Sequence, residues 1–187
     1  TQTVVEVGAG DSTAVLSTAN GGNLLITAAA NENDGLQLQL NNATPFQLNS
    51  LLPCYFGIKF QAGDVDQSDY LVGLAVQDTT AIAAVAHGVY FRSVDAAATV
   101  QFILEKNSLE SSTTVATMVD ATDITLEFYF DGINTTAYVD GVQQAQVAFT
   151  STNHPDDVSL TPTIAFLTGE AVANTMTVAW IKTIQLR

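Results

Sequence analysis

Basic side chains are scarce in this sequence, which has 5 lysine and arginine residues against 19 aspartate and glutamate residues and a formal net charge of -14 at pH 7. A basic patch that binds phosphate groups cannot be assembled from so few cations. They are Lys59, Arg92, Lys106, Lys182 and Arg187. The composition therefore excludes nucleic acids and anionic membrane surfaces as expected partners.

Cysteine and long hydrophobic runs are also nearly absent. Cys54 is the single cysteine, so neither an internal disulfide nor a multi-thiolate metal site is expected. Its place in the apolar run 54–60 predicts a buried free thiol. No stretch approaches the roughly 20 apolar residues of a membrane span, and the first residues show no basic or hydrophobic signal segment. We therefore expect a soluble chain, and Thr1 is compatible with removal of an initiator methionine.

Apolar residues are plentiful by contrast. They make up 47% of the 187 residues, and the mean hydropathy is +0.23. A chain of this size and composition suits one domain with a filled core. We predict a single domain over residues 1–187, with residues 1–30 as a candidate N-terminal strand or arm extension.

The apolar residues alternate with polar ones or form short runs between turns, which is typical of β-strands. Residues 36–40 alternate leucine with glutamine and predict a half-buried strand. Residues 124–149 predict a three-stranded meander, since Asp131-Gly132 and Asp140-Gly141 are strong hairpin-turn signals. The sequence therefore predicts an all-β chain, as a sandwich, a jelly roll or a barrel.

Further segments fit the same pattern. We expect residues 55–60 and 70–76 to form neighbouring core strands, residues 88–94 and 99–105 to form a hairpin around 95–98, and residues 79–87 to include a short helical turn. The remaining expected strands are 3–7, 14–17, 24–27, 163–167 and 175–186.

Residues that carry common chemistry are few. Nucleophilic catalysis needs a base beside the nucleophile, and His87 and His154 lie in no recognisable catalytic motif. Glu127 and Asp131 share one face of a predicted strand at a spacing of roughly 13 Å, given about 3.3 Å per residue. That spacing is too wide for the carboxylate pair of a glycosidase. We therefore assign both acids to a solvated outer face.

Two other groups leave alternatives open. The loop with Asp64, Asp66 and Asp69 is either an ordinary acidic connection or a site with three carboxylates for Ca²⁺, and Asp156-Asp157 is a weaker case. Six aromatic side chains either pack within strands or offer faces on which sugar rings stack. They are Tyr55, Tyr70, Tyr90, Tyr129, Tyr138 and Trp180.

Several segments together resemble the concanavalin A-like lectin/glucanase jelly-roll domains. In such domains the last hairpin commonly reads tyrosine, apolar residue, Asp or Asn, then Gly, here Tyr138-Val139-Asp140-Gly141. A closing strand, here 176–182, returns to pair with the N-terminal region. The other segments that carry the resemblance are 55–60, 70–74, 88–91 and 123–132.

A subgroup among the structural proteins of tailed-phage virions is more similar still. The similarity rests on Asn33-Asp34-Gly35 and on residues 68–76 with 78–80, 88–92, 160–162, 169–171 and 185–187. The resemblance implies an antiparallel jelly-roll β-sandwich of the concanavalin A-like type. The Glu-x-Asp-x-x-Glu run of the related glucanases is absent, and Ala179 and Trp180 stand where an Asp is expected in the closing strand.

The resemblance therefore implies a protein that is not an enzyme, with no catalytic, cofactor-binding or metal-binding residue. We expect a virion structural protein that decorates the capsid surface of a tailed phage and cements its icosahedral shell. Its partners are then the major capsid protein and further copies of itself, with a trimer as the expected oligomer. The alternative is a lectin-like module that binds host-surface glycans through an aromatic platform and Ca²⁺.

Overall fold

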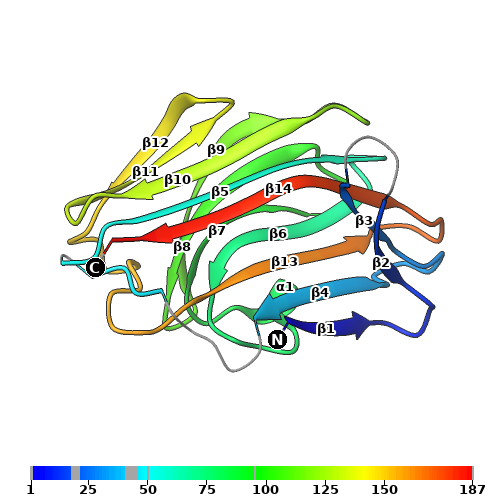
Figure 1. Cartoon of the computed structure of the whole chain (residues 1–187), viewed down its shortest axis with the longest axis horizontal. Coiled ribbons are helices and arrows are strands. Elements are labelled where there is room, and N and C mark those ends of the chain that lie inside the picture. The colour runs from blue at the N-terminus through cyan, green and yellow to red at the C-terminus, as the bar shows by residue number, and fades with distance from the viewer. Residues whose placement is uncertain (1, 18–21, 41–45, 50, 95, 187) are drawn as a thin grey trace.

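A computed structural model describes residues 2–17, 22–40, 46–49, 51–94 and 96–186. Part of the predicted turn at 20–23, Asp95 of the predicted hairpin turn and the terminal Arg187 lie outside these ranges. The described residues form two antiparallel sheets of seven strands each, which pack face to face (Figure 1). None of the described helices is long and apolar enough to cross a membrane.

The first sheet, called sheet A, begins and ends with strands from distant parts of the chain. Its spatial order is β1 (Gln2–Val7), β4 (Gly35–Leu40), β13 (Thr161–Thr168), β6 (Ser68–Ala75), β7 (Gly88–Ser93), β8 (Thr99–Lys106) and β9 (Leu109–Thr117). The hairpin of β7 and β8 is confirmed. Strand β9 was not predicted, because its serine- and threonine-rich sequence offers little apolar alternation.

The second sheet, called sheet B, contains the predicted meander. Its spatial order is β12 (Val142–Ala148), β11 (Asn134–Val139), β10 (Ile124–Phe130), β5 (Cys54–Ala62), β14 (Thr175–Gln185), β3 (Leu24–Thr27) and β2 (Thr13–Leu16). The closing strand β14 pairs with β3 on one side, as the resemblance implied, and with β5 on the other.

The core lies between the sheets and is rich in phenylalanine. Phe56 of β5 stacks on Phe128 of β10 with ring centroids 5.4 Å apart, and Phe91 and Phe102 of sheet A approach Phe128 from the other layer. The inner side chains of the central strands are buried, and those on strands near the sheet edges, such as Val139 and Val147, are partly buried against them. This apolar layer stabilises the sandwich and leaves each sheet with one outer face.

Two predictions about the strands are wrong. Strands β5 and β6 are not sheet neighbours, since β5 lies in sheet B and β6 in sheet A. Strand β4 is buried on both faces, because Gln37 and Gln39 are 1% and 4% exposed. The segment that contains the predicted helical turn, α1 (Ala81–Ala84), covers this part of the outer face of sheet A.

The two glutamines hold that covering segment through its backbone. Gln37 Oε1 accepts a hydrogen bond from the Ala81 N–H at 2.7 Å, and Gln39 Oε1 accepts one from the Asp78 N–H at 3.0 Å. The Gln39 amide also donates to the Val76 carbonyl at 3.0 Å. Buried glutamine is stable here because its polar groups are paired.

Candidate functional site

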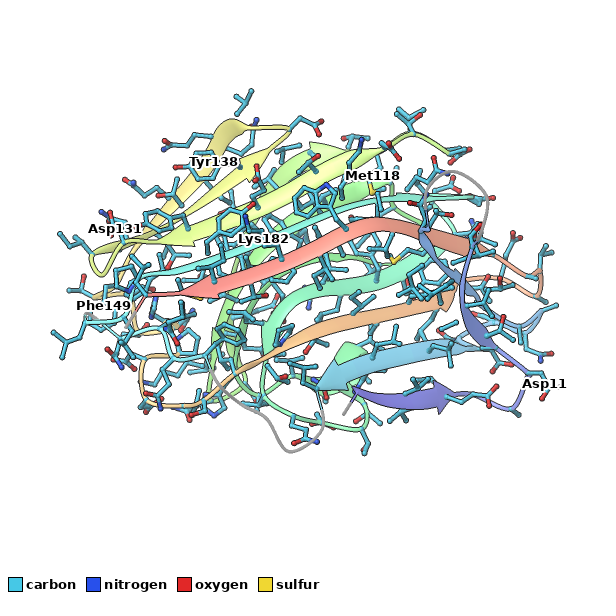
Figure 2. The ribbon with its side chains drawn as sticks, viewed as in Figure 1. Asp11, Met118, Asp131, Tyr138, Phe149 and Lys182 are labelled. Carbon is cyan, nitrogen blue, oxygen red and sulfur yellow. The ribbon has the colours of Figure 1, made fainter. Side chains whose placement is uncertain are left out.

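The six aromatic candidates separate into two buried and four surface residues. Tyr70 is fully buried and Tyr90 is 1% exposed. The other four point outward from sheet B and are called the aromatic face. They are Tyr55 on β5, Tyr129 on β10, Tyr138 on β11 and Trp180 on β14. Figure 2 shows Tyr138 and Lys182 on strands of this sheet.

Strand register places these four side chains near one another. Tyr55 and Tyr129 are direct cross-strand partners, so their Cβ atoms are about 5 Å apart. Tyr129 and Trp180 are 39% and 37% exposed, which is high for rings of this size. The sheet thus presents aromatic surface to solvent across four adjacent strands.

Gly57 forms the floor between two of these rings. A Cβ atom at this position would lie 2.3 Å from Tyr55 Oη and 3.1 Å from Trp180 Cζ3. Both rings therefore reach over the glycine from opposite sides, where a larger residue would hold them away. Aromatic side chains cover glycines of β-sheets in this way.

Polar groups border the rings. Tyr55 donates its hydroxyl hydrogen to Glu127 Oε1 at 2.5 Å, and burial together with Glu127 raises the pKa of Tyr55. Lys182, which pairs with Gly57 on the neighbouring strand, holds its Nζ 6.0 Å from the centre of the Tyr55 ring. Lys59 is bound by Asp123 at 2.9 Å. The face therefore combines ring surface with fixed donors and acceptors.

A second polar group lies on the outer face of sheet A. Tyr90 donates to Glu105 Oε2 at 2.5 Å, and burial raises the pKa of Glu105, which is 8% exposed. Arg92 donates to both carboxylate oxygens of Glu110, at 3.0 and 3.2 Å. These side chains and residues 81–85 line a cavity of about 170 Å³.

The other predicted candidates do not assemble a site. Asp131 accepts hydrogen bonds from two backbone N–H groups in the turn that follows it. Among the described residues, no group of three or more His, Cys, Asp or Glu is placed to hold a metal ion. Asp64 is hydrogen-bonded to Asp66, which raises its pKa. The three-carboxylate calcium alternative stays a hypothesis from the sequence.

Both histidines make hydrogen bonds within the fold. His154 is 1% exposed, contacts Thr135 Oγ1 at 2.9 Å and packs against Phe130 and Phe149. His87 Nδ1 accepts a hydrogen bond from the Asn107 N–H at 3.4 Å. Cys54 is buried and unpaired, as predicted.

Comparisons with known proteins identify the fold. No protein-family description and no curated protein matched the sequence. Among solved structures, the family 7 alginate lyase A1-II′ in complex with product has a TM-score of 0.69 at 8% identity, covering 96% of this chain and 86% of that one.

Two glucan-related structures give similar values. A GH16 protein of a Bacteroides ovatus mixed-linkage glucan locus, in complex with product, has a TM-score of 0.69 at 10% identity, with coverage of 92% and 85%. A β-1,3-glucanase from Mycobacterium marinum has a TM-score of 0.67 at 14% identity, with coverage of 98% and 90%. The fold is therefore the antiparallel jelly-roll β-sandwich of the concanavalin A-like type.

The prediction that the chain is not an enzyme is contradicted by these similarities, because alginate lyases and glucanases share the fold over most of the chain. The prediction relied on motifs that are contiguous in sequence. On a sheet face, side chains from several strands come together without a contiguous motif, as those of Tyr90 and Glu105 do here. A fold does not by itself assign an activity, and the similarity to phage virion proteins stays a prediction from the sequence.

Proposed function

We propose that this protein binds a carbohydrate chain on the aromatic face of sheet B. The observation that carries the proposal is the set of four outward rings on adjacent strands, two of which converge over Gly57. Aromatic side chains offer rigid apolar surface with a polar tip, which suits a sugar ring with apolar faces and hydroxyl edges. Glu127 and Lys182 supply an acceptor and a donor beside the rings.

The solved structures with this fold support the proposal, since those described above are an alginate lyase, a GH16 protein of a mixed-linkage glucan locus and a β-1,3-glucanase. These structures support the fold, and the position of the surface comes from this chain's own residues.

Affinity electrophoresis in gels that contain soluble polysaccharides tests the proposal. We expect a retarded wild-type band and a loss of about tenfold or more in affinity for Trp180→Ala and Tyr129→Ala, as truncation of a central aromatic contact typically causes. Leu109→Ala is the matched control, because this side chain is 65% exposed on the edge strand of the other sheet. Equal retardation of all four proteins would contradict the proposal.

The same variants separate glycan binding from self-association. Sedimentation velocity gives the oligomeric state of each protein. If Trp180→Ala dissociates an oligomer and leaves retardation unchanged, the aromatic face is a subunit interface and the proposal is wrong.

Cleavage of a glycan on the outer face of sheet A is the second candidate function. Glu105 and Glu110 are cross-strand partners in the β8–β9 ladder, so their Cβ atoms are about 5 Å apart. The raised pKa of Glu105 favours its protonated form, and Arg92 binds the Glu110 carboxylate. Hydrolysis of a glycosidic bond uses such a proton donor opposite an ionised carboxylate.

Release of reducing ends from glucan and alginate tests this candidate. We expect activity in the wild type that Glu105→Gln removes and that Trp180→Ala retains at saturating substrate. Activity that is unchanged in Glu105→Gln would exclude this carboxyl as the proton donor.

A further inference from the structure

The charges around the aromatic face indicate which class of glycan it takes. Among the described residues, the basic side chains of Lys59, Arg92 and Lys106 are all held in ion pairs with carboxylates. Lys182 is the described cation without a carboxylate within ion-pair distance, and its contact is the Tyr55 ring. A polyanionic glycan would therefore find one unpaired cation on this face.

Acidic groups outnumber basic ones along the same face. Glu127 lies on the face itself, Asp123 binds Lys59, and Asp131 and Asp140 lie at the ends of β10 and β11. Backbone hydrogen bonds from Asn134 and Ile133 lower the pKa of Asp131 and keep it ionised. Together with the net charge of -14, these carboxylates repel a ligand that carries one negative charge per sugar.

Hydrogen-bond chemistry also favours a glycan without charge. The Glu127 carboxylate only accepts hydrogen bonds and the Lys182 ammonium only donates them, whereas a sugar hydroxyl does both. A hydroxyl group of a sugar can therefore pair with either side chain. A uronate carboxylate only accepts, so it can pair with Lys182 but has no hydrogen to share with Glu127.

We infer that the aromatic face binds an uncharged polysaccharide and discriminates against uronate polymers. This inference rests on the proposed glycan-binding function. A neutral glycan loses no affinity to charge repulsion, and its binding through ring stacking and hydrogen bonds depends little on ionic strength.

The test compares neutral β-glucan with alginate, by affinity electrophoresis at about 20 mM and about 500 mM NaCl, a range over which the screening length falls several-fold. We expect β-glucan to retard the protein equally at both salt concentrations, within about twofold, and alginate not to retard it at low salt. Glu127→Gln keeps the shape of the side chain and removes its charge, and we expect measurable alginate binding in this variant. Glu32→Gln, an exposed carboxylate far along the sequence from the face, is the charge control.

Two outcomes overturn the inference and can be told apart. Alginate binding that exceeds β-glucan binding at low salt and is lost in Trp180→Ala contradicts the charge discrimination but leaves the glycan surface in place. Absence of binding to either polymer, with circular dichroism showing intact β-structure, contradicts the proposed function together with this inference.

Discussion

Tyr55 and Glu127 are joined by a hydrogen bond of 2.5 Å that runs diagonally between β5 and β10. The bond holds the tyrosine ring over Gly57 and leaves Glu127 Oε1 paired with the Tyr55 hydroxyl. A ring that is already held in place loses less conformational freedom when a ligand stacks on it. A fixed Tyr55 ring would therefore raise the affinity of this surface for the proposed glycan.

Removing the tyrosine hydroxyl tests this connection. For Tyr55→Phe we expect the free energy of unfolding to fall by about 1 kcal/mol, the typical net value of one hydrogen bond, and glycan affinity to fall several-fold. Urea titration and affinity electrophoresis measure the two effects. An unchanged affinity would show that the anchor has no part in binding.

Gly57→Ala is expected to weaken glycan binding more than folding. The new methyl group would lie 2.3 Å from Tyr55 Oη, so the ring must move while the strand backbone is retained. A double-mutant cycle isolates the Tyr55 part of the effect, because Tyr55→Ala removes the two nearest atoms and leaves the 3.1 Å approach to Trp180 Cζ3. In that background the Gly57→Ala change should cost less affinity, and a full cost there would point to another contact.

His154 makes stability depend on pH. Burial lowers its pKa to about 4 from an ordinary value of 6.5, so the native state favours the neutral ring. The unfolded chain binds the proton more readily, and stability is therefore lost as the pH falls from about 6.5 to about 4, by about 3 kcal/mol at most. Urea titrations between these pH values measure the loss.

The matched variants are His154→Gln and His87→Gln. We expect the first to be less stable at neutral pH and to lose much of this pH dependence, and the second to keep it, since His87 is only partly buried. Equal pH dependence in all three proteins would mean that other groups dominate the acid transition.

Gln37 controls the covering segment of sheet A. In Gln37→Leu, the Ala81 N–H and the Asp78 carbonyl lose their side-chain partner. Buried backbone groups left unpaired cost about 1–3 kcal/mol each. We expect faster hydrogen exchange in residues 78–84 by mass spectrometry, whereas Gln143→Leu on the exposed strand β12 should leave that segment unchanged.

The Cys54 thiol is expected to be unreactive in the native protein. It is 1% exposed, and burial raises its pKa to about 12, so the nucleophilic thiolate is scarce at neutral pH. A thiol reagent should modify it only at the rate of unfolding. Rapid native labelling would place the side chain at the surface.

Local patterning was sufficient to predict much of the fold. The two Asp-Gly turns located the meander, because few other residue pairs satisfy tight hairpin turns. The local sequence pattern did not predict which distant strands pair, nor that the outer face of sheet A is covered. Gln37 and Gln39 read as solvent-facing polar residues, and no local signal shows that residues 76–84 return to cover them.

The candidate site could be predicted by residue type but not by position. Tyr70 and Tyr90 occur in strand patterns similar to those of Tyr55 and Tyr129, yet the first pair is buried. Tyr90 became buried through the same covering segment that hides the glutamines. Glu127 was correctly assigned to an outer face, but its bond to Tyr55 depends on a register between strands that are 72 residues apart in sequence.

Strand β14 lies between β5 and β3, in the interior of sheet B. Until residues 175–185 are available, a growing or refolding chain has an open slot there, with unpaired backbone groups on two strands and one of the four rings of the aromatic face missing. Pairing over such a long loop is slow to nucleate, and open strand edges attract other chains. The strand that carries Trp180 thus completes the aromatic face late in folding, and a chain without it leaves two strand edges open to aggregation.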